Sequence, residues 1–253
     1  MKVFNGTRDN KKKIITIALF TIMVMILLAI VVVLLLKYNV EGETNLPFEL
    51  KNILLISTAD AEENDNPDKR WDLSILQNND IYLEVKKNNK YRGNEELKNI
   101  VIQNIQYDTK PEVGTPCIFK PSKEGDFTYI YTDENKVDDG TLEYTVTGSN
   151  NIKNMELASN GGIITFSSCS TNLAQYQSDD DTEIKYDGSL LEKSNISESQ
   201  LKYRLSFDVV IETVSGKKYK ATVSLDLPLD NITKDGTVKK EIKEQDKIIF
   251  KRI

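Results

Sequence analysis

Two hydrophobic patterns divide this chain, one near its N-terminus and one over the remainder. Residues 14–36 form a run of 23 without a charge, a proline or a glycine, in which only Thr16 and Thr21 are polar. At about 1.5 Å per residue a helix of this length spans roughly 34 Å, more than the hydrocarbon core of about 30 Å. A single span in lipid must pair all its backbone polar groups internally, so the run predicts one transmembrane helix.

Beyond residue 46, apolar and polar residues alternate with a period of two, which is typical of strands with one buried face. The clearest segments are 203–214 and 219–227, between which Gly216 supplies the positive φ of a tight hairpin turn. Pro228 cannot donate to a ladder and is predicted to end the second strand. Further short strands are predicted at 48–56, 71–76, 81–85, 100–102, 127–131, 142–146, 163–166 and 248–250.

These strands predict a mainly β fold, an antiparallel two-layer sandwich of jelly-roll-like kind, behind one N-terminal transmembrane α-helix. Two Ser-x-x-Glu/Gln spacings, Ser189 to Glu192 and Ser197 to Gln200, are typical of capping boxes and predict one or two helical turns within 189–201. The expected organisation is a basic leader at 1–13, the transmembrane helix at 14–36, a polar tether at 37–46 and one β-rich domain at 47–253.

The charges beside the apolar run predict its orientation. The leader carries a net charge of +4, whereas Glu41 and Glu43 follow the run soon after Lys37. The positive-inside rule therefore keeps the N-terminus in the cytoplasm and exports the C-terminal domain. No Ala-x-Ala-like site follows the run, which favours an uncleaved, single-pass anchor in the cell membrane over a removed signal peptide.

Acidity limits the partners of the exported part. Since the whole chain carries −6 and the leader +4, the remainder carries −10. A surface of that charge repels nucleic acid, so no nucleic-acid partner is predicted.

Composition adds a resemblance. Asn, Lys and Ile make up 76 of the 253 residues, the bias of an AT-rich coding sequence. With the short basic leader, the single apolar run and the closing residues 246–253, the layout resembles that of single-pass exported proteins of AT-rich Gram-positive bacteria. This resemblance concerns layout only and implies a place at the cell envelope without implying an activity.

The chain contains no histidine, which excludes Ser-His-Asp and Cys-His catalysis and zinc sites that need imidazole. Paired-carboxylate hydrolysis and Ser/Lys acylation remain open. Two Ser-x-x-Lys spacings occur, Ser199 to Lys202 and Ser215 to Lys218, about as many as chance predicts, and neither has the companion motifs of penicillin-binding proteins. No catalytic residue is assigned.

Acidic loops at 60–68, 133–139 and 179–183 are oxygen-rich, as calcium sites are. However, if the loop at 133–139 is aligned with an EF-hand, Val137 stands at the fifth ligand position and Asp138 stands where the motif needs glycine. These loops are therefore predicted to be solvated turns, with calcium binding as the alternative. No metal ligand set and no cofactor are predicted.

Cys117 and Cys169 are the only cysteines, and both lie in the part predicted to be exported. Two alternatives stay open for them. They form a disulfide, which persists in an oxidising compartment, or they are two buried thiols that act as small apolar side chains.

The sequence as a whole favours a binding or structural module without enzymatic activity, held at the outer face of the membrane. Its partner would be an envelope protein or a cell-wall polymer. The alternative is a wall-directed hydrolase or transferase that uses carboxylates or a Ser/Lys pair, which a deep cleft with two facing acids would favour.

Overall fold

The computed structural model describes residues 6–121, 129–146, 157–180, 184–243 and 248–253, with side chains from residue 12 onward. It divides into two units, one up to Thr44 and one from Asn45 to Ile253, and each is described by itself.

The first unit is the helix α1, Gly6–Glu41. Its part from Lys12 to Glu41 is the one helix among the described residues that is long and apolar enough to cross a membrane. The hydroxyls of Thr16 and Thr21 each donate to the backbone carbonyl four residues earlier, at 2.9 Å, so both are satisfied within the helix.

The helix α1 extends beyond the apolar run. Residues 37–41, expected in the tether, are helical, because nothing between Leu36 and Glu41 interrupts the backbone hydrogen bonds. The helix stops at Gly42, which has a φ of +72° and donates its N–H to the carbonyl of Tyr38. A left-handed glycine after the last helical residue is a common helix terminator.

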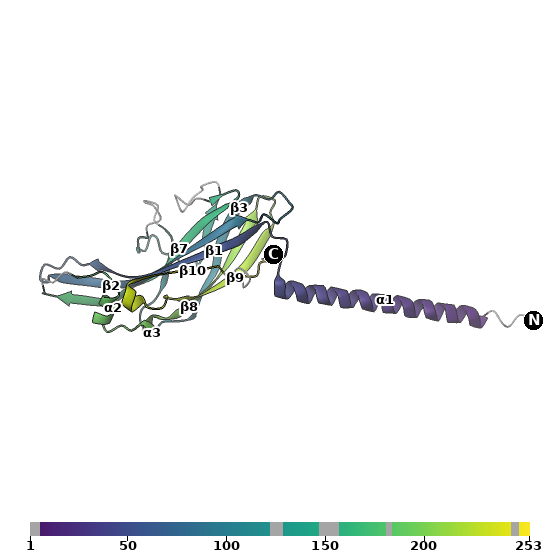
Figure 1. Ribbon diagram of the computed structural model, residues 1–253, viewed down its shortest axis with the longest axis horizontal. Coiled ribbons are helices and arrows are strands. Elements are labelled where there is room, and N and C mark those ends of the chain that lie inside the picture. The colour runs from purple at the N-terminus through teal and green to yellow at the C-terminus, as the bar shows by residue number, and fades with distance from the viewer. Residues whose placement is uncertain (1–5, 122–128, 147–156, 181–183, 244–247) are drawn as a thin grey trace, which may run out of the picture. The chain divides into compact units, whose positions relative to one another are not determined.

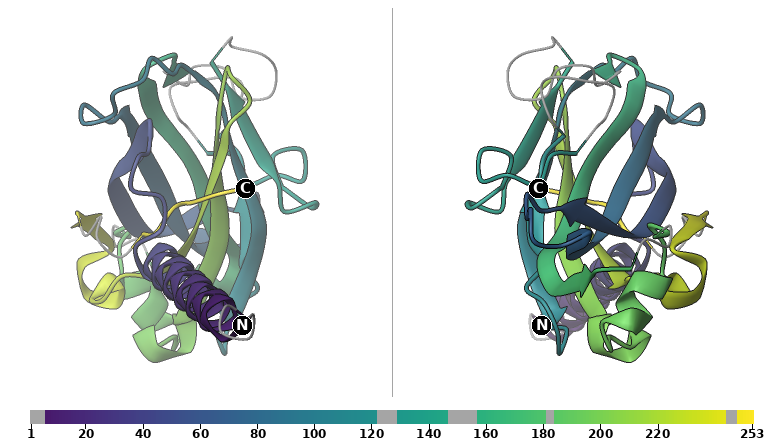
Figure 2. Two further views of the ribbon diagram at one scale, coloured as in Figure 1. Left: turned by 90° about the vertical axis from the view of Figure 1, so that its right-hand side faces the viewer. Right: turned by 90° about the vertical axis from the view of Figure 1, so that its left-hand side faces the viewer.

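The second unit is a sandwich of two antiparallel sheets (Figures 1 and 2), which confirms the predicted architecture. The first sheet has the order β10-β1-β2-β7-β4, with β6 also beside β7, and the second has the order β11-β9-β8-β3-β5. The strands of the first are β1 (Phe48–Glu63), β2 (Trp71–Lys87), β4 (Cys117–Phe119), β6 (Leu157–Ala158), β7 (Gly161–Ser178) and β10 (Thr237–Ile242). Those of the second are β3 (Leu97–Thr109), β5 (Leu142–Thr145), β8 (Tyr203–Thr213), β9 (Lys218–Leu227) and β11 (Lys251–Arg252).

Connections of two kinds join the strands. Hairpins link β1 to β2 and β8 to β9 within one sheet, whereas the chain passes to the other sheet between β2 and β3, between β3 and β4, and between β7 and β8. The predicted hairpin is confirmed: Gly216 has a φ of +83°, and β9 ends at the residue before Pro228.

Several strand predictions need correction. The segments predicted at 71–76 and 81–85 belong to one strand, β2, because the polar residues between them are hydrogen-bonded inside the domain. Residues 129–131 are not in a strand, and 127–128 lie outside the described residues. The last strand begins at Lys251, after the predicted 248–250, and β10 was not predicted.

The main core lies between the sheets, where the alternating apolar side chains of both meet. Phe166 of β7 and Phe207 of β8, one from each sheet, pack edge to face with ring centroids 5.2 Å apart. Such a contact adds to the free energy of burying two aromatic rings.

A smaller cluster packs the helices α2 (Ser189–Lys193), α3 (Glu198–Leu201) and α4 (Ile232–Asp235) against β1 and β2. The predicted helical turns within 189–201 are present. Gln200 accepts the backbone N–H of Ser197 at 2.9 Å, as a capping box requires. Ser189 is instead the first residue of α2, and its N–H is accepted by Asp187 at 2.9 Å.

A buried polar chain links the two sheets beside these clusters. Ser57 donates to the Asn79 carbonyl oxygen at 2.7 Å, and the Asn79 amide donates to the Tyr203 hydroxyl at 3.0 Å. Ser168 lies 2.7 Å from the same hydroxyl, and all four residues are buried. Because each side chain has partners, β2 crosses the interior without leaving these polar atoms unpaired.

The central aromatic pair gives a stability prediction. Phe166→Ala should lower the free energy of unfolding by about 3–5 kcal/mol, because it removes a fully buried ring and leaves a cavity. Ile163→Ala, on the same strand where the side chain is 43% exposed, should cost less than about 1 kcal/mol. Urea unfolding followed by tryptophan fluorescence checks both, and equal losses would contradict the assignment of the core.

Candidate functional site: a groove beside a free strand edge

A groove follows the side of the sandwich where β9 and β10 approach each other. One cavity of about 560 Å³ is lined by β9 residues Thr222–Asp226, by Lys240–Lys243, and by Ile53 and Ile248. A second, of about 370 Å³, is lined by Thr109, Lys202, Tyr203, Asp226, Pro228–Asp230 and Lys240. Asp226 and Lys240 line both, so the cavities are neighbours along one groove.

Along the β9 side of this groove, part of the strand edge has no backbone partner among the described residues, which leave out 244–247. Two hydrogen bonds show which way the backbone groups of β9 point. The carbonyl of Lys217, just before β9, accepts the N–H of Thr213 on the β8 side, and the carbonyl of Lys218 accepts the N–H of Ile253 on the β11 side. The two sides alternate along a strand, and the β8–β9 register has no shift. The N–H and C=O groups of Thr222, Ser224 and Asp226 therefore point away from β8.

β11 does not reach these residues. It pairs with β9 only at Tyr219 and Lys220, and no described residue bonds the outward backbone groups of Thr222, Ser224 or Asp226. Three successive outward-facing positions therefore lack a backbone partner in the part of the chain that the structure describes.

The edge of β10 is of a different kind. It carries Lys239 and Lys240, both exposed, and lysines on an edge strand oppose pairing with another chain. On β9, Lys218 and Lys220 come before the groove, and the positions at the groove include the small polar side chains of Thr222 and Ser224. Of the two edges at this groove, β9 is the one suited to accept a strand.

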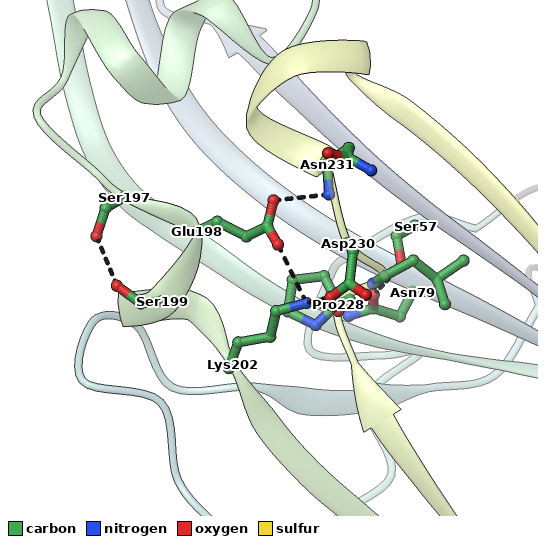
Figure 3. Close-up of polar contacts among 10 residues, drawn as sticks. Ser57, Asn79, Ser197, Glu198, Ser199, Lys202, Pro228, Asp230 and Asn231 are labelled. Carbon is green, nitrogen blue, oxygen red and sulfur yellow. Dashed lines mark hydrogen bonds and ion pairs between the residues drawn. The ribbon is translucent and has the colours of Figure 1, made fainter.

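The end of the groove near α3 holds a paired set of charges (Figure 3). The ammonium of Lys202 donates to the Pro228 carbonyl at 2.8 Å and to Asp230 at 2.6 Å, and it lies 3.4 Å from Glu198. Glu198 also accepts the backbone N–H of Asn231 at 2.7 Å. These contacts fix the turn after β9 against α3.

The carboxylates of the groove are ion-paired. Arg204 donates to both oxygens of Asp226, at 2.7 and 3.1 Å. Its hydrogen bonds lower the pKa of Asp226, and the hydrogen bond from Lys202 lowers the pKa of Asp230. A general acid needs a raised pKa at neutral pH, so this pair does not fit paired-carboxylate hydrolysis.

Asp80 is the described carboxyl whose pKa is raised, by burial. It lies on β2 beside Asn78, in the central part of the first sheet rather than on β9 or β10. It lines neither of the two cavities of the groove.

The Ser-x-x-Lys residues are not brought together. The hydroxyl of Ser199 lies 3.1 Å from that of Ser197, and Figure 3 shows it turned away from the ammonium of Lys202. Ser215 donates to Glu95 at 2.6 Å, while Lys218 pairs with Glu212. Neither lysine is placed to take a proton from its serine.

The acidic loops do not form a cation site in the part of the chain that the structure describes. No group of three or more His, Cys, Asp or Glu residues converges there. Residues 181–183 of the third loop lie outside the described residues. In the first loop, the oxygen of Asn66 accepts the backbone N–H of Asp68 at 3.1 Å, and Asp60 accepts that of Ala61 at 2.8 Å.

The first loop is held instead by a single carboxylate at the start of β2. Asp72 accepts amide hydrogens from Asn64, Gln175 and Gln177 at 2.7 Å each, and also from Asn66. These hydrogen bonds, that from Asn66 first, hold its pKa well below the usual range. Asp72 thus ties the β1–β2 connection to the far end of β7.

The two cysteines lie opposite each other. Cys117 of β4 and Cys169 of β7 are register partners in an antiparallel pair, and both are free thiols in the structure. The sequence shows that there are two cysteines, but it does not show that they lie opposite each other on neighbouring strands.

The groove itself was missed by the sequence prediction, because one of its walls is β10. Val238 and Ile242 are the only apolar residues of that strand. Their spacing of four, with Lys240 between them, is a weak signal for a strand, and it becomes visible only once β10 is seen beside β1.

Comparison with known proteins adds no family: no protein-family model matches the sequence, and no curated protein matches it.

The hydrogen bonds to Asp72 predict that the stability of the fold depends on pH. A carboxyl whose pKa is lowered in the folded state stabilises it fully above the unfolded pKa of about 3.9, and this contribution is lost as the pH falls below that value. Asp72→Asn should lower the melting temperature at pH 7, because the new amide presents an N–H₂ to amide donors, and it should weaken the loss of stability on acidification.

Asp65→Asn is the matched control, since Asp65 is exposed in the same loop. Thermal melts between pH 7 and pH 3 compare the three proteins. Equal pH profiles of Asp72→Asn and wild type would contradict the role of Asp72.

Proposed function

We propose that this chain is a membrane-anchored, extracytoplasmic binding module of the cell envelope, and that its β-domain holds an extended peptide segment of an envelope protein along the free edge of β9. The observation that carries the proposal is the groove in which the outward backbone groups of Thr222, Ser224 and Asp226 lie beside an open cavity.

Strand addition fits the spacing of these groups. Outward-facing residues recur at every second position of a strand, as they do in a partner strand, so an extended peptide can pair with all three in register. The neighbouring ionic groups, such as Arg204 with Asp226 and Lys202 with Asp230, already neutralise one another. A bound peptide therefore needs no large net charge of its own.

A wall polymer fits the same groove less well. Sugar rings stack on exposed aromatic side chains, and the one aromatic residue among the described lining of the two groove cavities, Tyr203, is only 3% exposed. Its hydroxyl is bonded to Asn79 and Ser168 inside the domain. The lining favours peptide over carbohydrate.

The location rests on the helix and its flanks. One N-terminal helix is long and apolar enough to cross a membrane, and basic residues precede its apolar run at 14–36 while Glu41 and Glu43 follow that run. By the positive-inside rule the N-terminus stays in the cytoplasm and the β-domain is exported.

A wall-directed hydrolase or transferase is the weaker second candidate. The ion-paired carboxylates of the groove and the separated serine and lysine side chains offer no general acid and no activated nucleophile there. We therefore propose binding without catalysis for the groove.

The proposed topology predicts the result of a protease experiment. Full-length chain with a C-terminal tag should stay with membranes at alkaline pH, and protease added to intact protoplasts should remove the tag. A variant lacking residues 14–36 should be absent from the membrane fraction. A tag that resists protease until the membrane is broken would contradict export, and release of a shortened chain into the medium would contradict the anchor.

The groove predicts a specific effect of proline. Ser224→Pro removes one outward N–H without touching the β8–β9 ladder, because the backbone of Ser224 faces away from β8. With a photoreactive residue in place of Lys240, the full-length chain should give a discrete cross-linked protein in cells. Ser224→Pro should reduce the yield of this cross-linked product at least about tenfold, because the loss of one hydrogen bond costs roughly 1.4 kcal/mol of binding free energy.

Ser224→Ala is the matched control, since it removes the same hydroxyl and keeps the N–H. A photoreactive residue at Glu143, on β5 at the other edge of the same sheet, should not give the product. A yield that is insensitive to Ser224→Pro, or the same product from position 143, would contradict strand addition at β9.

A further inference from the structure

We propose that Cys117 and Cys169 form a cross-strand disulfide that fastens the edge strand β4 to β7 in the exported protein. Its formation in cells rests on the proposed export of the β-domain, whereas its geometry does not.

The register places the two residues within reach of a disulfide. Directly opposite residues of an antiparallel pair have Cα atoms about 4.5 or 5.5 Å apart, and disulfides join Cα atoms about 4.4–6.8 Å apart. Side chains of directly opposite residues also project to the same face of the sheet. Cys117 and Cys169 are such a pair, followed by Ile118 with Ser168 and Phe119 with Ser167.

Packing confirms that both side chains are on one face. Cys169, Phe119 and Leu76 form a small apolar cluster, against which Cys117 and Tyr131 are partly buried. The thiol of Cys117 now lies 3.8 Å from the carbonyl oxygen of Thr115. A rotation about its Cα–Cβ bond is the movement that brings its sulfur toward Cys169. With only two cysteines in the chain, no other intramolecular pairing competes.

The two thiols differ in access, which sets the order of the chemistry. Cys117 is partly exposed, whereas Cys169 is fully buried, and burial raises the pKa of its thiol. The oxidant is a thiol–disulfide oxidoreductase of the envelope in its disulfide form. The thiolate of Cys117 attacks that disulfide, forming a mixed disulfide and releasing one oxidoreductase thiolate.

Cys169 completes the exchange. Its thiol loses a proton, its sulfur attacks the sulfur of Cys117, and the second oxidoreductase sulfur leaves as a thiolate and is protonated. The two cysteines have then lost two electrons and two protons, and the oxidoreductase has gained both as a dithiol.

The bond would matter because β4 is weakly held. It has only three residues, Cys117–Phe119, and forms one edge of its sheet. Beyond it, Lys136 bridges back to Phe119. A covalent tie at the first residue of β4 holds this edge and restricts the segment between the two cysteines in the unfolded chain.

The decisive measurement is the thiol state of the full-length chain. Cells are quenched with acid, the protein is denatured, and free thiols are alkylated before or after reduction. We expect no alkylation before reduction, two alkylated cysteines after it, and an intact mass about 2 Da below that of the reduced chain. Two alkylated cysteines without reduction, in a chain whose C-terminal tag is removed by protease added to intact protoplasts, would overturn the proposal.

A second arm tests the geometry without relying on export. Purified full-length chain in detergent is reduced and then equilibrated with glutathione disulfide. Wild type should form the internal bond, and Cys169→Ser should accumulate a glutathione adduct on Cys117. Cys117→Ser should stay unmodified while folded, because Cys169 is buried. A glutathione adduct on folded wild type in place of the internal bond would overturn the pairing, whereas an internal bond here with free thiols in cells would instead count against export.

A thermal readout separates a structural bond from an incidental one. Reduction should lower the melting temperature of wild type by about 10 °C, from the loop-closure effect of some fifty residues. The melting temperature of Cys117→Ala should not respond to the reductant. An unchanged wild-type melting temperature on reduction would contradict a role for the bond in holding β4.

Discussion

Backbone N–H and C=O groups need hydrogen-bond partners, and each part of this chain meets that constraint differently. The helix α1 pairs its groups internally and even returns the hydroxyls of Thr16 and Thr21 to its own carbonyls, which makes it compatible with lipid. The sheets pair strand with strand. At the edge of β9 the outward groups of Thr222, Ser224 and Asp226 lack a described partner, and this is where we propose that another chain adds.

The interior obeys the same rule for side chains. Asn79 sits in the middle of β2, where an apolar residue would be expected, and is held by Ser57 and Tyr203 from neighbouring elements. Asp72 accepts hydrogen bonds from four side-chain amides at the start of that strand. Burying such groups costs free energy unless every atom is paired, so these contacts require a particular placement of strands rather than mere burial.

The charged groups of the groove follow from the same pairing. Glu198 begins α3, Lys202 directly follows it, and Asp230 lies in the turn after β9. Arg204 of β8 lies opposite Asp226 of β9. Their mutual neutralisation leaves a polar surface without a strongly perturbed acid or base. This is the electrostatic character of a binding surface more than that of a catalytic centre.

The sequence by itself determined the apolar helix, the hairpin of β8 and β9 with Gly216 at its turn, and the two-layer architecture, because each follows from local periodicity. The tertiary structure alone decided that β2 is one strand through Asn79, that β10 forms a wall of the groove, and that Cys117 faces Cys169. These features depend on which strands become neighbours and in which register. Residues far apart in the chain settle that choice through shared burial and hydrogen bonding, which a local pattern does not record.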